Sequence, residues 1–280
     1  MDKKKRLLAL PYIAWTVAFS IIPLIIIFVY SFCERTPYGD IVFKFTYDNY
    51  VKFFQPIYLK VLWRSIVLAV ASTAGCLLIG YPMAWIIARA KEKARNFMVM
   101  LFVLPLWTNF LLRTYAWMGL LRENGFFNQV LMSLRLIDEP LKLLYTEGAV
   151  FVGMVYNFLP FMVLPIYSVL VKMDQGHIDA ANDLGADPRQ TFIKVVLPLS
   201  FPGIVSGIIM VFMPALSTFI ISDLLGGGQT MLLGNLIQNQ FLSARNWQFG
   251  SAISSVMIVM VLIITLVSSK YRSEGSEMLW

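Results

Sequence analysis

Long apolar stretches without charged side chains alternate with short polar segments along this 280-residue chain. A helix that spans the hydrocarbon core of a bilayer needs about 20 mostly apolar residues, because the core is about 30 Å thick and each residue adds about 1.5 Å. The stretches that meet this requirement are 7–32, 65–88, 97–121, 149–171, 200–222 and 249–269. All but one lack charged residues, and the third contains only Arg113. The pattern predicts an all-α membrane protein with six transmembrane helices.

The first stretch follows the basic cluster Lys3–Arg6, the position in which a signal peptide would lie. Its apolar run is far longer than the roughly 7–15 residues of a signal sequence, and no cleavage site of small residues follows it. We therefore expect it to remain in the mature protein as the first transmembrane helix.

Composition supports this membrane class. Hydrophobic residues make up 58% of the chain and charged residues 14%, whereas about a quarter of the residues of soluble domains are charged. The net charge of +7 arises from Lys and Arg between the apolar stretches, so it does not indicate a nucleic-acid partner. Cys33 and Cys76 provide neither a disulfide framework nor the spacing of a metal site.

The distribution of Lys and Arg predicts the orientation, because cytoplasmic segments of membrane proteins are enriched in these residues. If both termini are cytoplasmic, the inside segments have about twice the Lys and Arg density of the outside segments. The turn Arg89–Arg95 contributes most to this bias. We therefore expect a cytoplasmic N-terminus and a cytoplasmic C-terminus.

We find no internal repeat or low-complexity segment and expect residues 1–280 to form a single transmembrane domain. Outside the spans, residues 46–54 resemble a capped aromatic helix that anchors a loop near the interface. Residues 226–230 are rich in glycine and should break the chain, and 231–242 should form a short surface helix. The polar residues of this last helix include Asn235, Gln238 and Asn239.

The segment 172–199 should contain two short helices separated by a break. Asp174 is placed to cap the first helix, and Gly185 is suited to end it because glycine tolerates a left-handed conformation. Asp187 then reads as the next N-cap, with Pro188 at the first helical position. A loop with two well-specified helices indicates a docking element.

We expect Pro198 and Pro202 to stop the second helix where the fifth span begins. Other prolines lie inside the expected spans, where each removes a backbone donor and favours a kink. These are Pro82, Pro105, Pro160, Pro165 and Pro214.

Several residues of this loop follow a fixed spacing. The pattern is Asp179-Ala180-Ala181, then Gly185 after three residues, Val195 after nine more, and Leu197-Pro198 after one more. It resembles the EAA loop of binding-protein-dependent ABC importer permeases, with Asp in place of Glu and Val in place of Ile. The resemblance implies a type I ABC importer (MetI-like) permease fold, in which 172–199 is the cytoplasmic coupling loop.

Further motifs resemble the B-type spermidine/putrescine permeases of this family. They run from the first outer loop to just past the fifth span and comprise Tyr47–Tyr50, Gly80–Trp85, Leu104–Asn109, Arg113–Tyr115, Leu159–Met162 and Ser222–Gly227. This likeness implies import of polyamines. The alternatives within the family are iron, thiamine, a phosphonate or an opine.

The family resemblance also implies the partners. Two permease subunits pair in the bilayer, here with a second homologous permease, and two ATPase subunits receive their coupling loops. An extracytoplasmic substrate-binding protein delivers the substrate. Asp179 would form an ion pair with the ATPase, and Gly185 would provide the helix break. Ala180 and Ala181 would permit close approach. The alternative is that Asp179 only stabilises its own helix electrostatically.

The chain has no Gly-x4-Gly-Lys-Ser/Thr phosphate-binding loop. We therefore expect the partner ATPase to use ATP and Mg²⁺, and this chain to bind no cofactor or metal and to have no enzymatic activity. The single histidine, His177, excludes a two-histidine metal site within the chain. A channel or secondary transporter also fits six spans, but neither needs a structured docking loop.

Polar groups inside spans usually face a cavity or a partner, because they are costly in lipid. The third span concentrates them, and positions 109, 113 and 117 share one helix face. The candidates for the substrate path are Trp107, Thr108, Asn109, Arg113, Tyr115, Trp117, Tyr156, Asn157, Ser217, Thr218 and Asp223. Contact with substrate and plain helix packing remain alternatives for each of them.

A polyamine carries several ammonium groups on an apolar chain and should be bound by carboxylates and aromatic faces. The acids at the outer ends of the central spans are Glu123, Glu147 and Asp223. We favour Asp223, because it continues the polar end of the fifth span. Arg113 would repel an ammonium group, so it should be neutralised by the partner permease or lie off the path.

Overall fold

The computed structural model describes residues 11–12, 14–35 and 41–277. Five helices are long and apolar enough to cross a membrane: Ala14–Ser31, Pro56–Arg89, Glu147–Leu170, Pro188–Ser217 and Trp247–Ser268. A bent pair of helices, Glu92–Trp107 and Phe110–Ser133, completes a sixth apolar segment. The predicted helical membrane class is confirmed. The cluster Lys3–Arg6 and the start of the expected first span lie outside the described residues.

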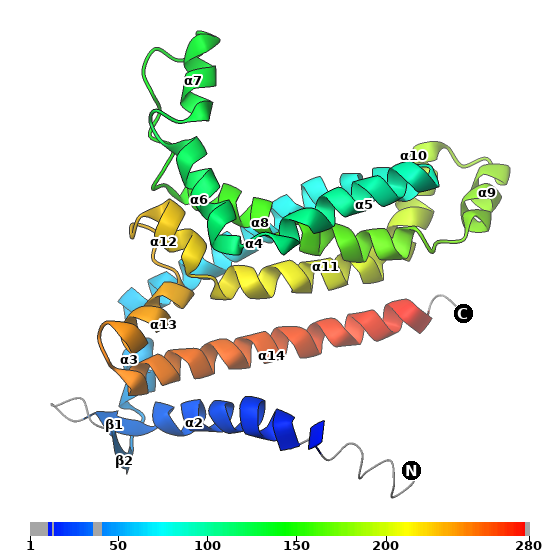
Figure 1. The fold of residues 1–280 in the computed structure, drawn as a ribbon. Coiled ribbons are helices and arrows are strands. Elements are labelled where there is room, and N and C mark those ends of the chain that lie inside the picture. The colour runs from blue at the N-terminus through cyan, green and yellow to red at the C-terminus, as the bar shows by residue number, and fades with distance from the viewer. Residues whose placement is uncertain (1–10, 13, 36–40, 278–280) are drawn as a thin grey trace, which may run out of the picture. The chain divides into compact units, whose positions relative to one another are not determined.

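Helices dominate the described part of the chain (Figure 1). The helices before the third span are η1 (Val17–Ile21), α2 (Ile22–Ser31), α3 (Asp48–Phe53) and α4 (Pro56–Arg89). The middle of the chain forms α5 (Glu92–Trp107), α6 (Phe110–Leu121), α7 (Phe126–Ser133), α8 (Glu147–Leu170), α9 (Gln175–Asp183) and α10 (Pro188–Thr191). The last helices are η2 (Phe192–Val196), α11 (Leu197–Ser217), α12 (Ile220–Gly226), α13 (Leu233–Leu242) and α14 (Trp247–Glu277).

The chain divides into two compact units. The first comprises the chain up to Val61 together with Leu236–Leu262, and the second comprises Leu62–Asn235 together with the chain from Ile263. This division does not test the prediction of a single domain.

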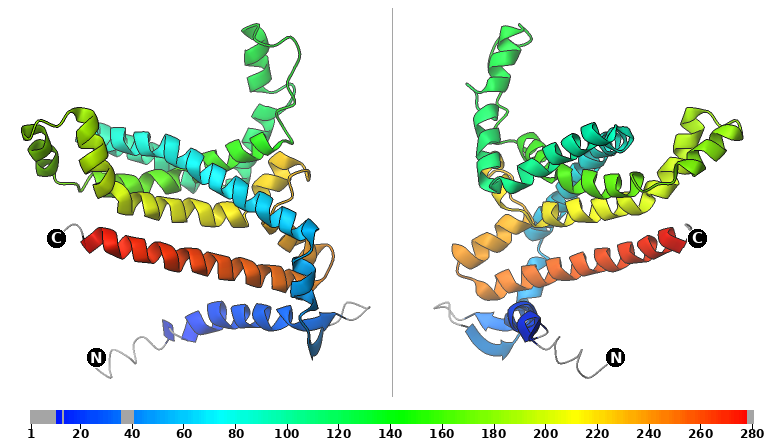
Figure 2. Two further views of the ribbon diagram at one scale, coloured as in Figure 1. Left: turned by 180° about the vertical axis from the view of Figure 1, so that it is seen from behind. Right: turned by 45° about the vertical axis from the view of Figure 1, so that its right-hand side comes forward.

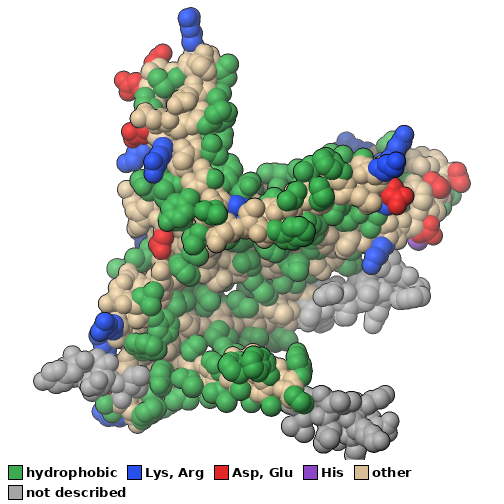
Figure 3. Space-filling view, viewed as in Figure 1, with side chains coloured by type: hydrophobic (Ala, Val, Ile, Leu, Met, Phe, Trp, Pro, Cys, Tyr) green, Lys and Arg blue, Asp and Glu red, His purple; other side chains and the backbone are tan. Residues whose placement is uncertain are grey.

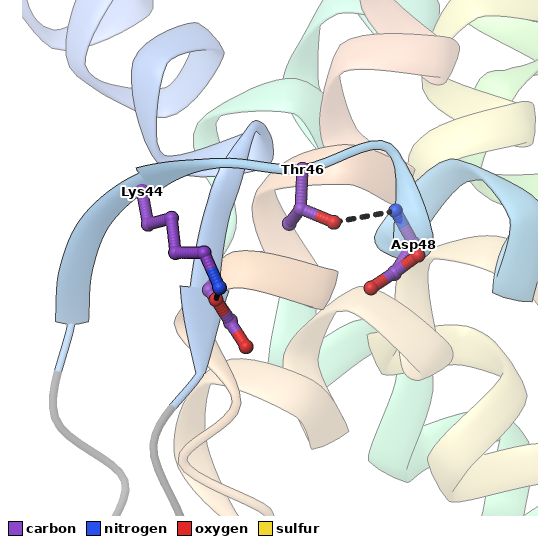
Figure 4. A network of polar contacts seen from close by, with 4 residues as sticks. Lys44, Thr46 and Asp48 are labelled. Atoms are coloured by element: carbon purple, nitrogen blue, oxygen red, sulfur yellow. Dashed lines mark hydrogen bonds and ion pairs between the residues drawn. The ribbon is translucent and has the colours of Figure 1, made fainter.

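The first unit contains a hairpin that the all-α prediction did not include. Strands β1 (Cys33–Arg35) and β2 (Ile41–Phe45) pair antiparallel. Lys44 Nζ lies 2.9 Å from Glu34 Oε2 (Figure 4), and the hydrogen bond and charge of Glu34 raise the pKa of Lys44. A helix is present where it was predicted, as α3, and the Asp48 backbone N–H donates to Thr46 Oγ1.

The core of the second unit forms where α8 packs against α11, and the two helices lie side by side in every view (Figures 1 and 2). Small residues permit this approach. A Cβ atom at Gly207 would lie 2.7 Å from Met162 Sδ and 3.2 Å from the Met162 carbonyl oxygen. At Gly203 it would lie 3.1 Å from the Ile166 Cα. Close backbone contact through glycine is a common way to join helices in lipid, where no hydrophobic force favours their association.

The third apolar segment is not the continuous helix that 97–121 suggested. Helix α5 ends at Trp107, α6 begins at Phe110, and the pair is bent by 96°. Pro105 cannot donate a backbone hydrogen bond, and Thr108 donates from its backbone N–H and its Oγ1 to the Pro105 carbonyl. Asn109 adopts an extended conformation and its side chain accepts from the Leu111 N–H. These local bonds favour a new helix start over a straight span.

The fifth span also differs from the prediction at both ends. Pro198 and Pro202 do not stop the preceding helix, because residues Pro188–Ser217 form one 30-residue helix. Its π-helical turn η2 has a wider backbone, which gives the ring of Pro198 room beside the preceding carbonyls. The helix ends at Ser217 rather than Ser222, where the Thr218 N–H donates to the Pro214 carbonyl. Helices α4 and α8 continue through Pro82, Pro160 and Pro165.

Candidate functional site

The loop 172–199, which the sequence predicts to be the coupling loop, has the expected two-helix form. Asp174 Oδ1 accepts from the Gly176 N–H at 2.9 Å and caps α9. Gly185 has a φ of +82°, so it follows α9 in the left-handed region that favours glycine. Asp187 Oδ1 accepts from the Gln190 N–H at 2.7 Å and caps α10. Each predicted cap is therefore confirmed, and the caps hold both helices at defined ends.

The outward face of α9 carries charge and one large apolar side chain. Asp179 and Asp183 are exposed, and Leu184 is 89% exposed. Ile178 is buried on the opposite face and anchors the helix. Figure 3 shows acidic side chains gathered at this end of the second unit. Leu184 was not among the predicted site residues. Its position directly before the helix-ending glycine is the sequence signal that identifies it.

The other predicted members of the motif occupy different surroundings. Ala180 is exposed beside Asp179, and Ala181 is half-buried. Leu197 and Pro198 are exposed but begin α11, so they belong to the span rather than to the face of α9.

An aromatic contact joins the coupling loop to the rest of the second unit. Phe192, in η2, lies edge-on to Tyr81 and to Trp85 of α4, with both ring centroids 5.7 Å away. Tyr81 Oη and Ser200 Oγ are 2.8 Å apart. The Arg89 guanidinium lies 3.9 Å from the centroid of the Trp85 ring. The motif Gly80–Trp85 therefore supports the segment that continues from the coupling loop into α11.

The polar face of α6 is largely occupied by contacts within the second unit. Asn109 caps α6, as described above. Trp117 lies between Tyr156, 5.3 Å away, and Phe127, 5.9 Å away. Asn157 is buried on α8 and donates to the Gly153 carbonyl. These residues pack helices together in this structure.

The guanidinium group of Arg113 lacks hydrogen-bond partners for part of its donors. Its guanidinium lies 5.7 Å from the centroid of the Phe110 ring. Its Nε and Nη1 atoms are buried and have no hydrogen-bond partner within the described chain. Trp107 and Tyr115, by contrast, are 82% and 52% exposed, so their rings are open to another molecule.

The three candidate acids differ in their partners. Glu147 forms an ion pair with Arg64, which also donates to the Gln229 carbonyl at 3.0 Å. Glu123 is exposed in a loop pocket beside Lys142. Asp223 is exposed on α12 and has no cationic partner among the described residues. The charge of Glu147 is thus neutralised by Arg64, whereas the charge of Asp223 is not neutralised by a described residue.

Asp223 is held by a residue that the sequence reading placed on a surface helix. Asn235 is only 7% exposed, and its Nδ2 donates to Asp223 Oδ1 at 2.5 Å. Helix α12 itself packs against α8, where Ile221 and Leu225 fill the space beside Gly153. Ser217 and Thr218 stand at the break that precedes α12. No sequence signal distinguishes Asn235 from Asn239, because burial depends on contacts with other segments.

Comparisons with known proteins agree with this arrangement. The family model of the binding-protein-dependent transport system inner membrane component matches residues 77–271. The spermidine/putrescine transport system permease protein PotB of Salmonella typhimurium is 39% identical over 266 residues, which cover 95% of this chain and 93% of that protein. PotB of Escherichia coli is 40% identical over 255 residues, covering 91% and 93%.

Solved structures show the same fold. A chain of a bacterial ABC transporter involved in the import of alginate, an acidic polysaccharide, matches with a TM-score of 0.77 at 19% identity, covering 98% of this chain and 96% of that one. A chain of the MetNI methionine ABC transporter, in an inward-facing conformation, matches with a TM-score of 0.55 at 17% identity, covering 78% and 95%.

Proposed function

The chain belongs to the family of binding-protein-dependent transport system inner membrane components, and from this premise we propose that it is the permease subunit of an ATP-driven importer of spermidine and putrescine. One observation carries the proposal of polyamines: identity of 39–40% to permeases named for these substrates, over 91–95% of this chain. The chain is a bacterial inner-membrane component of a transporter, and transport would proceed by alternating access.

The division of labour follows from the family. Two ATPase subunits would hydrolyse ATP with Mg²⁺, a second homologous permease would complete the path, and an extracytoplasmic binding protein would deliver the substrate. This chain would bind no cofactor. The exposed face of α9, with Asp179, Asp183 and the 89% exposed Leu184, supports a docking role, since it presents an apolar side chain beside acidic groups that a partner can contact. This arrangement requires the coupling loop and both termini to be cytoplasmic.

The substrate path has the chemistry that a polyamine needs. An ammonium group is stabilised by a carboxylate, and its apolar chain can lie on aromatic faces. Asp223 offers a carboxylate without a cation, and Trp107 and Tyr115 offer open rings. Arg113 needs an anionic or hydrogen-bonding partner from outside the described residues, for which the second permease is the natural source.

Uptake of labelled spermidine and putrescine tests the proposal. The assay uses membrane vesicles that carry this chain with its ATPase, second permease and binding protein. We expect uptake to require ATP. Asp179→Lys should lower it by at least about tenfold, because truncating one partner of an interfacial charge pair costs several kcal/mol. Asp138→Lys, which makes the same charge change at an exposed position outside the loop, should leave uptake unchanged.

Two results would contradict different parts of the proposal. ATP hydrolysis that responds to the binding protein without polyamine uptake would keep the importer and exclude polyamines as its substrate. Uptake that proceeds equally without ATP and with Asp179→Lys would exclude the ABC importer itself and favour a channel or secondary transporter.

A further inference from the structure

Asn235 uses every hydrogen-bonding position of its side chain. Its Oδ1 accepts from Ser222 Oγ at 2.6 Å and from the Leu232 N–H at 3.0 Å. Its Nδ2 donates to the Phe219 carbonyl at 3.0 Å and to Asp223 Oδ1 at 2.5 Å. An amide has two acceptor positions and two donor hydrogens, so a rotation that exchanges oxygen and nitrogen would break the bonds to the Leu232 N–H, the Phe219 carbonyl and Asp223. The amide of Asn235 is therefore fixed in one orientation.

The start of α13, which carries Asn235, is fixed as well. The Leu233 N–H donates to Ser65 Oγ of α4 at 2.8 Å. Gly234 lies directly against the end of α11, since a Cβ atom there would clash with the Ser217 carbonyl and lie 2.8 Å from that of Thr218. The amide is thus held in place by α4, by the break after α11 and by α12.

One oxygen of Asp223 is left for a ligand. Oδ1 receives the Asn235 amide, whereas Oδ2 has no hydrogen bond within the described chain, and the carboxylate is exposed. A single bond to a rigid, buried donor sets the direction of the carboxylate. A carboxylate that is already oriented loses less freedom when it binds a cation, which favours binding and passage.

We propose that Asn235 is the positioning residue of Asp223, and that the free Oδ2 of this pair receives one ammonium group of the polyamine as it passes the break between α11 and α12. This inference rests on the proposed function. Asn235 itself does not touch the substrate, because its polar atoms are all engaged and it is only 7% exposed.

The experiment uses the complete transporter in vesicles with its binding protein. The variants are Asn235→Asp, Asp223→Asn and the exchanged double variant that combines them. The matched control is Asn239→Asp, which makes the same change at an exposed position of α13. Three quantities are measured: the amount of assembled complex, the ATPase rate stimulated by the binding protein, and the spermidine imported per ATP hydrolysed. The last ratio does not depend on how much complex folds.

Both single variants should lower the spermidine imported per ATP by about tenfold or more, the factor that a hydrogen bond to a charged group represents. Asn235→Asp keeps the acceptor for Ser222 and Leu232 but removes the donors to Asp223 and to the Phe219 carbonyl. It also adds a second negative charge beside Asp223. Asn239→Asp should behave as the unmodified protein. The exchanged double variant again has one amide and one carboxylate, which removes the repulsion between two carboxylates, so it should assemble better than Asn235→Asp although the Phe219 carbonyl lacks its donor. It should not regain the ratio, because its carboxylate is buried at position 235.

An unchanged ratio in either single variant would refute the inference. So would recovery of the ratio in the double variant, because the pair would then serve packing alone. Failure of the proposed function is seen separately, in the unmodified complex, as stimulated ATP hydrolysis without spermidine uptake.

Discussion

Three candidate acids lie near helix ends and differ in their bonding partners: Asp223, Glu147 and Glu123. Arg64 neutralises Glu147, whereas Asp223 receives an amide and no cation within the described chain. A charge that is already paired has little to offer a cationic substrate, because it must first lose its partner. At the scale of single residues, the neighbours of an acid decide whether it is available to a ligand.

The aromatic contacts of Phe192 join the predicted coupling loop to α4, and the substitution Phe192→Ala tests their contribution to stability. The variant removes both aromatic contacts with α4 and should destabilise the second unit by about 1–3 kcal/mol. Thermal unfolding of the solubilised transporter measures the change. Phe201→Ala is the control, because Phe201 is 45% exposed on α11. Equal effects of the two substitutions would show that the contacts of Phe192 contribute nothing specific.

At the scale of helices, proline alone does not determine where a span breaks. Of the five prolines expected to kink spans, only Pro105 and Pro214 lie within one turn of a helix end. At both ends the threonine that follows the helix is extended, and its N–H donates to the proline carbonyl. Pro82, Pro160 and Pro165 lack such an end, and their helices continue past them.

The close contact between α8 and α11 predicts that an added methyl group at Gly207 lowers stability. Gly207→Ala should destabilise the transporter by about 1–3 kcal/mol, because the added methyl group overpacks the contact with Met162. Gly119→Ala is the matched control, since a Cβ atom there has nothing within 4 Å. Unfolding midpoints of the two variants in one detergent give the comparison. A midpoint of Gly207→Ala at or above that of Gly119→Ala would rule out tight packing here.

At the scale of the whole molecule, one helix connects the two parts of the candidate site. Residues Pro188–Ser217 run without a break from the coupling loop to the polar end that precedes Asp223. In the proposed importer, a displacement of α9 by the ATPase would have a continuous element through which to reach the proposed substrate path. Both parts belong to the second compact unit.

Labelling of a single introduced cysteine tests this arrangement. Leu184→Cys should react with a membrane-impermeant maleimide in inside-out vesicles that lack the ATPase, and the bound ATPase should protect it. Leu136→Cys, 67% exposed between α7 and α8, should react only in right-side-out vesicles. The native Cys33 and Cys76 are buried, which keeps the background low. Labelling of both positions from the same side would contradict the proposed topology, which places them on opposite sides of the membrane.

Much of this protein is determined locally and was therefore readable from its sequence. Charge-free stretches predict spans because lipid excludes charge along the whole of each stretch. Asp174, Gly185 and Asp187 predict the form of the coupling loop because a cap acts on backbone groups only two or three residues away. The EAA-like spacing indicated the family because all of its residues lie in one short segment of the chain.

Contacts between distant segments decided the rest. The burial of Asn235, the pairing of Glu147 with Arg64 and the packing of Trp117 on Tyr156 each join residues far apart in the chain. A hydrophobicity pattern describes one segment at a time, so it placed Asn235 on a surface, and it favoured Asp223 over Glu123 and Glu147 only by position along the chain. Only the tertiary structure brings α12 and α13 together, and with them the amide and the carboxylate of the proposed ammonium site.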